Sequence, residues 1–203
     1  MAKTKVKLIK GDQRTLEHEV WSKWIDTVAK LFDRHISAWP EDDPLAYNET
    51  ASVAFLAAAG SVAGYVTLAE CKTDKLDSTE ADSAKLERRK RQGRADLWLH
   101  STKRYWAFEF KQRLGVGVSR ANGRLASWMK LAEKCALDID DEEDGKPVAG
   151  LILPLYFIED DEKSDRASEE IKAFASKEAD YCWLISPPHQ RRPTYILFKF
   201  VEK

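Results

Sequence analysis

The chain has 203 residues, a formal net charge of −1 and 43% hydrophobic residues. This length suits one well-buried core and is marginal for two, so we expect a single domain over residues 1–203. No apolar run reaches the about 18 residues that would span a membrane, and the start lacks the apolar core of a signal peptide. Three scattered cysteines, Cys71, Cys135 and Cys182, argue against a disulfide framework or a zinc site. We therefore expect a cytoplasmic protein without a membrane anchor.

The first part of the chain predicts two helices and a strand. Apolar residues at helical spacing indicate an amphipathic helix over about 14–34. Asn48 is a suitable cap for a second helix, which small residues continue to Gly60. The segment 65–71 is typical of a strand, and a highly charged connection leads from it to Arg94.

The remainder of the chain predicts strands and helices in alternation. The expected elements are strands over 94–99 and 105–112, a helix from 119, a strand over 148–157, a helix over 168–178, and strands over 181–185 and 195–201. A mixed sheet with helices on both faces is the simplest packing for this order, so the expected fold class is α/β.

The two adjacent strands in the middle of the chain carry three charged residues among aromatic and aliphatic ones. Asp96 lies in the first strand, and Glu109 and Lys111 lie in the second. Side chains alternate across a strand, so Glu109 and Lys111 should share a face. Two carboxylates brought together out of water need a proton or a cation to neutralise them. A divalent metal would do so, and hard oxygen ligands select Mg²⁺, with Mn²⁺ as a substitute.

A basic stretch surrounds this candidate site. From Ala84 to Arg124 there are twelve Lys and Arg residues against three Asp and Glu residues, a local net charge of +9 that leaves −10 for the rest of the chain. Such a stretch is what a polyanionic, phosphate-bearing substrate requires, although Lys and Arg also simply keep surfaces soluble. The candidate nucleic-acid-binding residues are Arg88, Arg89, Arg91, Arg94, Arg113 and Arg120.

The order helix, strand, Asp-bearing strand, Glu-x-Lys strand, helix resembles the PD-(D/E)xK nuclease superfamily over about residues 48–160. The resemblance implies a restriction-endonuclease-like mixed central sheet flanked by helices on both faces. It also implies that Asp96 and Glu109 bind magnesium, and that Lys111 positions or deprotonates the attacking water or steadies the charge on the phosphate. Glu49 matches the glutamate that the first core helix of this family often directs at the metals. The sequence departs from the family pattern in having Ala95 before Asp96 instead of proline, and in its long connection before the Asp-bearing strand.

The acid-x-Lys triplet has little specificity by itself, because it also occurs at 70–72, 161–163 and 170–172. The copy at 161–163 is expected in an acidic loop. The copy at 170–172 is expected in a helix, where positions i and i+2 point in different directions. The copy at 70–72 belongs to a strand that no Asp-bearing strand closely precedes. Only the copy at 109–111 follows a strand with a partner carboxylate.

Each candidate residue also has an ordinary structural explanation. Asp96 could pair with a nearby arginine, and Glu109 with Lys111 could form a surface charge pair that contributes under about 1 kcal/mol. Glu49 could simply favour the N-terminus of its helix through the helix dipole.

We therefore expect a metal-dependent nuclease that acts on nucleic acid, with DNA favoured over RNA. A homodimer is an open alternative, because many relatives pair to cut both strands. The rival function is a catalytically inactive nuclease-like fold that binds nucleic acid or a protein. A third class, an inhibitor that mimics nucleic acid through its acidic surface between Asp138 and Glu162, has only composition behind it.

Overall fold

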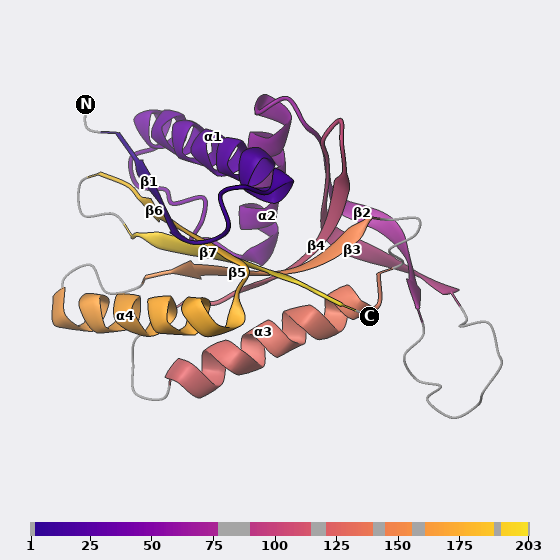
Figure 1. The fold of residues 1–203 in the computed structure, drawn as a ribbon. Coiled ribbons are helices and arrows are strands. Elements are labelled where there is room, and N and C mark those ends of the chain that lie inside the picture. Colours follow the sequence, from indigo (N-terminus) through magenta and orange to yellow (C-terminus); the bar gives the residue numbers. More distant parts are fainter. Residues whose placement is uncertain are drawn as a thin grey trace.

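The computed structural model describes residues 3–76, 90–114, 121–139, 145–155, 161–188 and 192–202, which form seven strands and four helices (Figure 1). In chain order these are β1 (Lys5–Lys10), α1 (Leu16–Ala38), α2 (Glu49–Val62), β2 (Val66–Leu76), β3 (Lys90–His100), β4 (Tyr105–Gln112), α3 (Ala121–Leu137), β5 (Lys146–Pro154), α4 (Asp161–Glu178), β6 (Tyr181–Ser186) and β7 (Thr194–Phe200).

The predicted order of elements is confirmed, with one strand missed. Strand β1 was not expected, because its lysines at positions 5, 7 and 10 hide a short alternation of Val6 and Leu8. Helix α4 begins at Asp161 rather than near 168, so the prediction of an acidic loop at 161–163 was wrong.

All seven strands belong to one sheet, in the order β1-β6-β7-β5-β4-β3-β2. Neighbouring strands are antiparallel except β4 and β5, which are parallel. Helix α3 makes the crossover between these two, as a parallel connection requires. Helices α1 and α2 lie on one face of the sheet, and α3 and α4 lie on the other (Figure 1). The chain thus has an α/β fold with a mixed sheet between two helical layers.

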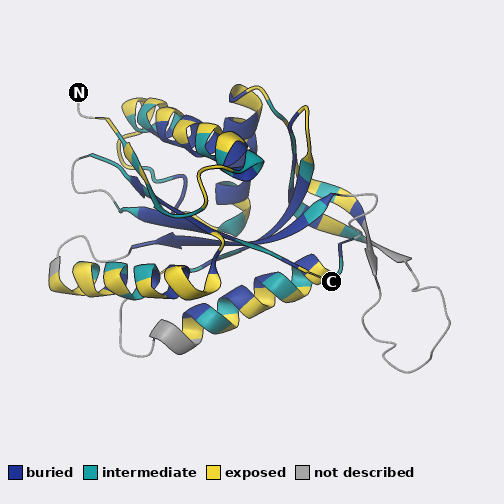
Figure 2. Ribbon diagram, viewed as in Figure 1, coloured by how far each residue is buried: buried dark blue, intermediate teal, exposed yellow. Residues whose placement is uncertain are grey.

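The two layers have different cores, and strand β4 contributes to both (Figure 2). Trp106, Phe108 and Phe110 point toward α1 and α2, where they join a largely aromatic cluster. Ala107 points the other way, into the aliphatic cluster under α3 and α4. The predicted alternation along β4 is therefore confirmed for its apolar residues. The aromatic side is anchored by Trp24, whose indole N–H donates to the carbonyl of Leu56 in α2 (2.8 Å).

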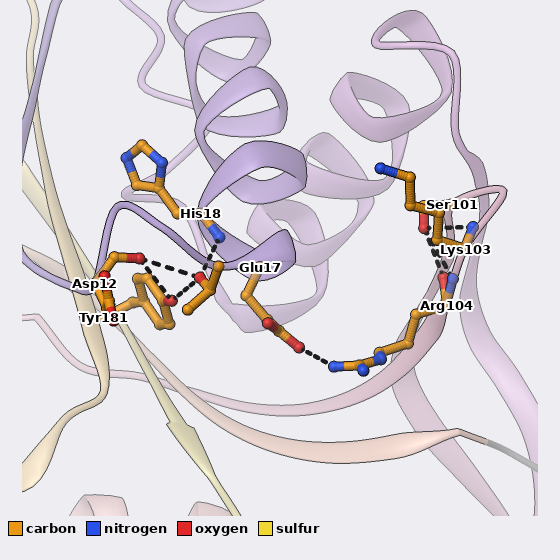
Figure 3. A network of polar contacts seen from close by, with 8 residues as sticks. Asp12, Glu17, His18, Ser101, Lys103, Arg104 and Tyr181 are labelled. Atoms are coloured by element: carbon orange, nitrogen blue, oxygen red, sulfur yellow. Dashed lines mark hydrogen bonds and ion pairs between the residues drawn. The ribbon is translucent and has the colours of Figure 1, made fainter.

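The N-terminal end of α1 is tied to two distant parts of the sheet (Figure 3). The hydroxyl of Thr15 caps the helix by accepting from the amide of His18 (3.1 Å) and also contacts the hydroxyl of Tyr181 in β6. The Glu17 carboxylate, with only 8% of its side chain exposed, binds the guanidinium of Arg104 in the turn between β3 and β4. Helix α1 therefore fixes the turn from which β4 begins.

Arg104→Ala should lower the free energy of unfolding by about 1–3 kcal/mol, because it leaves the buried Glu17 carboxylate without its cation. Urea unfolding at neutral pH measures this loss. Lys103→Ala is the matched control, since its ion pair with Glu19 is exposed on both sides and should contribute less than about 1 kcal/mol. Equal losses in the two variants would show that the Glu17–Arg104 pair does not hold the turn.

Candidate active site

The candidate site lies where β3 and β4 separate. Their paired residues run from His100–Tyr105 to Leu97–Phe108, while β3 continues along β2 to its other end. Past Phe108, side chains take over from the neighbouring strand. An oxygen of Asp96, Oδ2, accepts a hydrogen bond from the amide of Phe110 (2.7 Å), and Oε2 of Glu49 accepts one from the amide of Gln112 (2.9 Å). Two carboxylates thus complete the hydrogen bonding along this edge of β4.

Asp96 reaches this edge because the alternation of β3 is interrupted at this residue. Leu97 packs into the cluster under α1 and α2, whereas Ala95, two residues away, packs into the cluster on the opposite face. Across from Asp96, between the pairs Ala69–Leu97 and Cys71–Ala95, the backbone of Glu70 has a left-handed φ of 52°. A residue with a Cβ pays about 1–2 kcal/mol for that conformation. Both irregularities turn the Asp96 carboxylate toward β4.

Lys111 joins the two carboxylates. Its Nζ donates to Oε1 of Glu49 (3.0 Å) and to the carbonyl of Phe110. Burial by itself lowers the pKa of Lys111, but the hydrogen bond to Glu49 and the negative charges of Asp96 and Glu49 outweigh it, so the pKa is raised. Lys111 is therefore a cation at neutral pH.

The pKa of Asp96 is also raised. Burial is the largest cause, and the negative charges of Glu49 and Glu70 act in the same direction. The hydrogen bond from Phe110 and the positive charge of Lys111 act in the opposite direction without cancelling the shift. Three acidic side chains thus act on one place with a single lysine among them, an environment that favours binding a further cation.

Glu109 lies in a different environment from these groups. Its residue is 4% exposed, and it stands beside Ala149 of β5 in the part of the sheet that α3 covers. Within the described residues, no group of three His, Cys, Asp or Glu side chains lies close enough together to hold a metal ion. The structure brings Asp96, Glu49 and Lys111 together, and it does not show Glu109 completing a ready-made ligand set with them.

The predicted arginines divide into two groups. Arg94 is exposed and pairs with Glu70 (3.6 Å), while Arg113 lies at the end of β4 with its guanidinium over the ring of Trp128 (5.8 Å). Both therefore lie beside residues of the site. Arg88, Arg89 and Arg120 are outside the described residues, and of Arg91 only the backbone in β3 is described.

Two residues that the sequence did not assign to the site take part in it. Gln112 is buried, donates from Nε2 to the carbonyl of Leu45 (2.8 Å) and accepts from the hydroxyl of Ser52 (3.2 Å). It fastens the start of α2 to β4 and so places Glu49. Glu70 belongs to the triplet at 70–72 that was set aside, yet it lies across from Asp96. An antiparallel strand that follows Glu70, rather than precedes it, was the overlooked signal.

No protein-family model, curated protein or solved structure matches the chain. Any conclusion about function therefore rests on the geometry of this site. No helix in the described part of the chain has the length and apolar character needed to cross a membrane.

Asp96→Asn should leave the protein at least as stable as wild type at pH 7. The raised pKa of Asp96 means that its ionised form destabilises the fold, and an Asn side chain still offers an oxygen to the amide of Phe110. Because protonation removes the charge in wild type as well, the advantage of the variant should shrink as pH falls through that raised pKa. Urea unfolding between pH 7 and pH 4 tests both statements. A variant clearly less stable than wild type at pH 7 would contradict them.

Proposed function

We propose that this protein is a Mg²⁺-dependent nuclease of the PD-(D/E)xK type, with a restriction-endonuclease-like fold. The observation that carries the proposal is the meeting of Asp96, Glu49 and Lys111 at the edge of β4, where β3 leaves it. These residues come from three separate elements, and they are the acid, the acid and the lysine that phosphodiester hydrolysis requires. The helix-strand-strand-strand-helix-strand order from α2 to β5 supports the fold assignment.

The donor chemistry of the site fits a hard divalent cation, because the oxygens come from carboxylates. When bound, Mg²⁺ would supply an activated water and a Lewis acid for the phosphate. Asp96 and Glu49 would hold it through the oxygens that the backbone amides do not use. Since one of these oxygens is the partner of Lys111, metal binding would free the ammonium. We keep Glu109 as a proposed ligand because of its position in β4, two residues before Lys111.

Lys111 would act as a charge stabiliser rather than as a base. Its raised pKa keeps the ammonium protonated at neutral pH, and a base must be able to accept a proton. Released from Glu49, the ammonium would face the negative oxygens of the phosphate, where charge builds up in the transition state. Arg94 and Arg113 would contact neighbouring phosphates of the nucleic acid, with DNA as the favoured substrate.

Lys111→Ala should lower Mg²⁺-dependent cleavage of DNA by at least about 100-fold while the fold is retained. The measurement is cleavage of labelled single- and double-stranded DNA, with circular dichroism to verify folding. Lys72→Ala is the matched control, since Lys72 closes the other strand-borne triplet, and it should cleave like wild type. Unchanged cleavage by Lys111→Ala, in preparations free of contaminating nuclease, would overturn the proposal.

One observation favours the second candidate, an inactive nuclease-like fold that binds nucleic acid or protein. Both carboxylates of the site already serve backbone amides, and Lys111 already neutralises Glu49. Calorimetry with Mn²⁺ separates the two functions. The nuclease should take up the metal, and Asp96→Asn should weaken that uptake. Failure of the wild-type protein to bind Mn²⁺ would favour the inactive module.

A further inference from the structure

Strands β2 and β3 have one face under a helix and one face open. Helix α2 packs against both strands, and the hydroxyl of Thr67 donates to the carbonyl of Ala57 in that helix (2.7 Å). On the opposite face, α3 packs against β4 and β5. The neighbours of Thr67 in β2 point to that opposite face, where Val66 is 58% exposed and Leu68 is 53% exposed. Figure 2 shows exposed positions along β2.

This open face has an apolar and aromatic composition. Val66 pairs with His100, which pairs with Tyr105, and Leu68 pairs with Trp98 in the next row. The three rings form a cluster, with centroids 5.5 Å apart for Trp98–His100, 5.9 Å for Trp98–Tyr105 and 5.8 Å for His100–Tyr105. All three ring-bearing residues are half-buried. We call these five residues the aromatic strip.

The aromatic strip leads into the candidate active site. Trp98 is two residues from Asp96 in β3, and Ala107, which faces Trp98 across the β3–β4 ladder, is two residues from Glu109 in β4. Exposed Arg94 follows on the other side of Asp96. Rings, carboxylates and a guanidinium thus succeed one another along a single strand, over about 20 Å at the rise of an extended strand.

We infer that the aromatic strip binds unpaired bases of single-stranded nucleic acid and guides that strand to the site, an inference that rests on the proposed function. A duplex hides the faces of its bases and presents phosphates, so it offers nothing for exposed Val66, Leu68 and the rings to cover. Unpaired bases stack on aromatic side chains whatever their sequence. A second copy of the chain is the other possible occupant. The nucleic acid is favoured because the strip runs on into charged residues instead of ending in a closed apolar patch.

The experiment measures binding of wild-type protein to labelled oligo-dT and to a duplex of equal length, in EDTA so that nothing is cleaved. Fluorescence anisotropy should show at least about tenfold tighter binding of the single strand. Trp98→Leu keeps an apolar side chain but removes the ring, and it should weaken oligo-dT binding about tenfold or more. Trp98→Phe should restore most of that loss, and Leu68→Ser, at an exposed position, should weaken binding in the same direction.

Trp39→Leu is the matched control, because Trp39 is 63% exposed at the end of α1, in the layer on the other side of the sheet. It should bind oligo-dT like wild type. Equal or tighter binding of the duplex would overturn the inference, and so would equal effects of Trp98→Leu and Trp39→Leu. A change in sedimentation of Leu68→Ser with unchanged oligo-dT affinity would assign the strip to a second copy instead.

Failure of this inference and failure of the proposed function give different results. Mg²⁺-dependent cleavage that Trp98→Leu does not affect would leave the nuclease standing and remove the role of the strip. Oligo-dT binding that depends on Trp98, in a protein that cleaves nothing with Mg²⁺ or Mn²⁺, would support the strip and overturn the nuclease.

Discussion

The separation of β3 from β4 after the Leu97–Phe108 pair is the constraint on which the site depends. A strand edge inside a protein cannot leave its amides without partners, because an unpaired buried N–H costs about as much as a lost hydrogen bond. Here Asp96 and Glu49 provide the partners. The groups that satisfy the edge are therefore acidic, and they are held at fixed places by a backbone that needs them.

The same arrangement explains why the site is under electrostatic strain. Carboxylates suit backbone amides as acceptors, but two of them near Glu70 create more negative charge than Lys111 alone offsets. The raised pKa of Asp96 expresses that imbalance. A site that satisfies its hydrogen bonds yet remains too acidic is stable enough to fold and still gains from a cation. Structural and proposed catalytic roles are therefore carried by the same oxygens.

The rest of the fold holds this edge in position. Aromatic side chains of β4 pack under α1 and α2, and the Glu17–Arg104 pair fixes the turn before the strand. At the other end of β4, Gln112 joins the strand to α2 and to the segment before it. The opposite face carries smaller side chains under α3, and toward β2 it is open and lined by the aromatic strip. The sheet thus changes from a packed core to an exposed surface across three strands.

Local sequence patterns were sufficient for the elements and for much of the site. Helical periodicity, the Asn48 cap and the alternation of β4 depend on neighbouring residues, and these predictions are confirmed. Glu49, Asp96 and Lys111 were also selected from sequence, with the help of a family resemblance. The tertiary structure alone decided that Glu49 pairs with Lys111, that Asp96 interrupts its strand, and that Glu70 lies opposite it. Those contacts join residues up to 62 positions apart, and they arise from strand register and backbone demand, which no local pattern encodes.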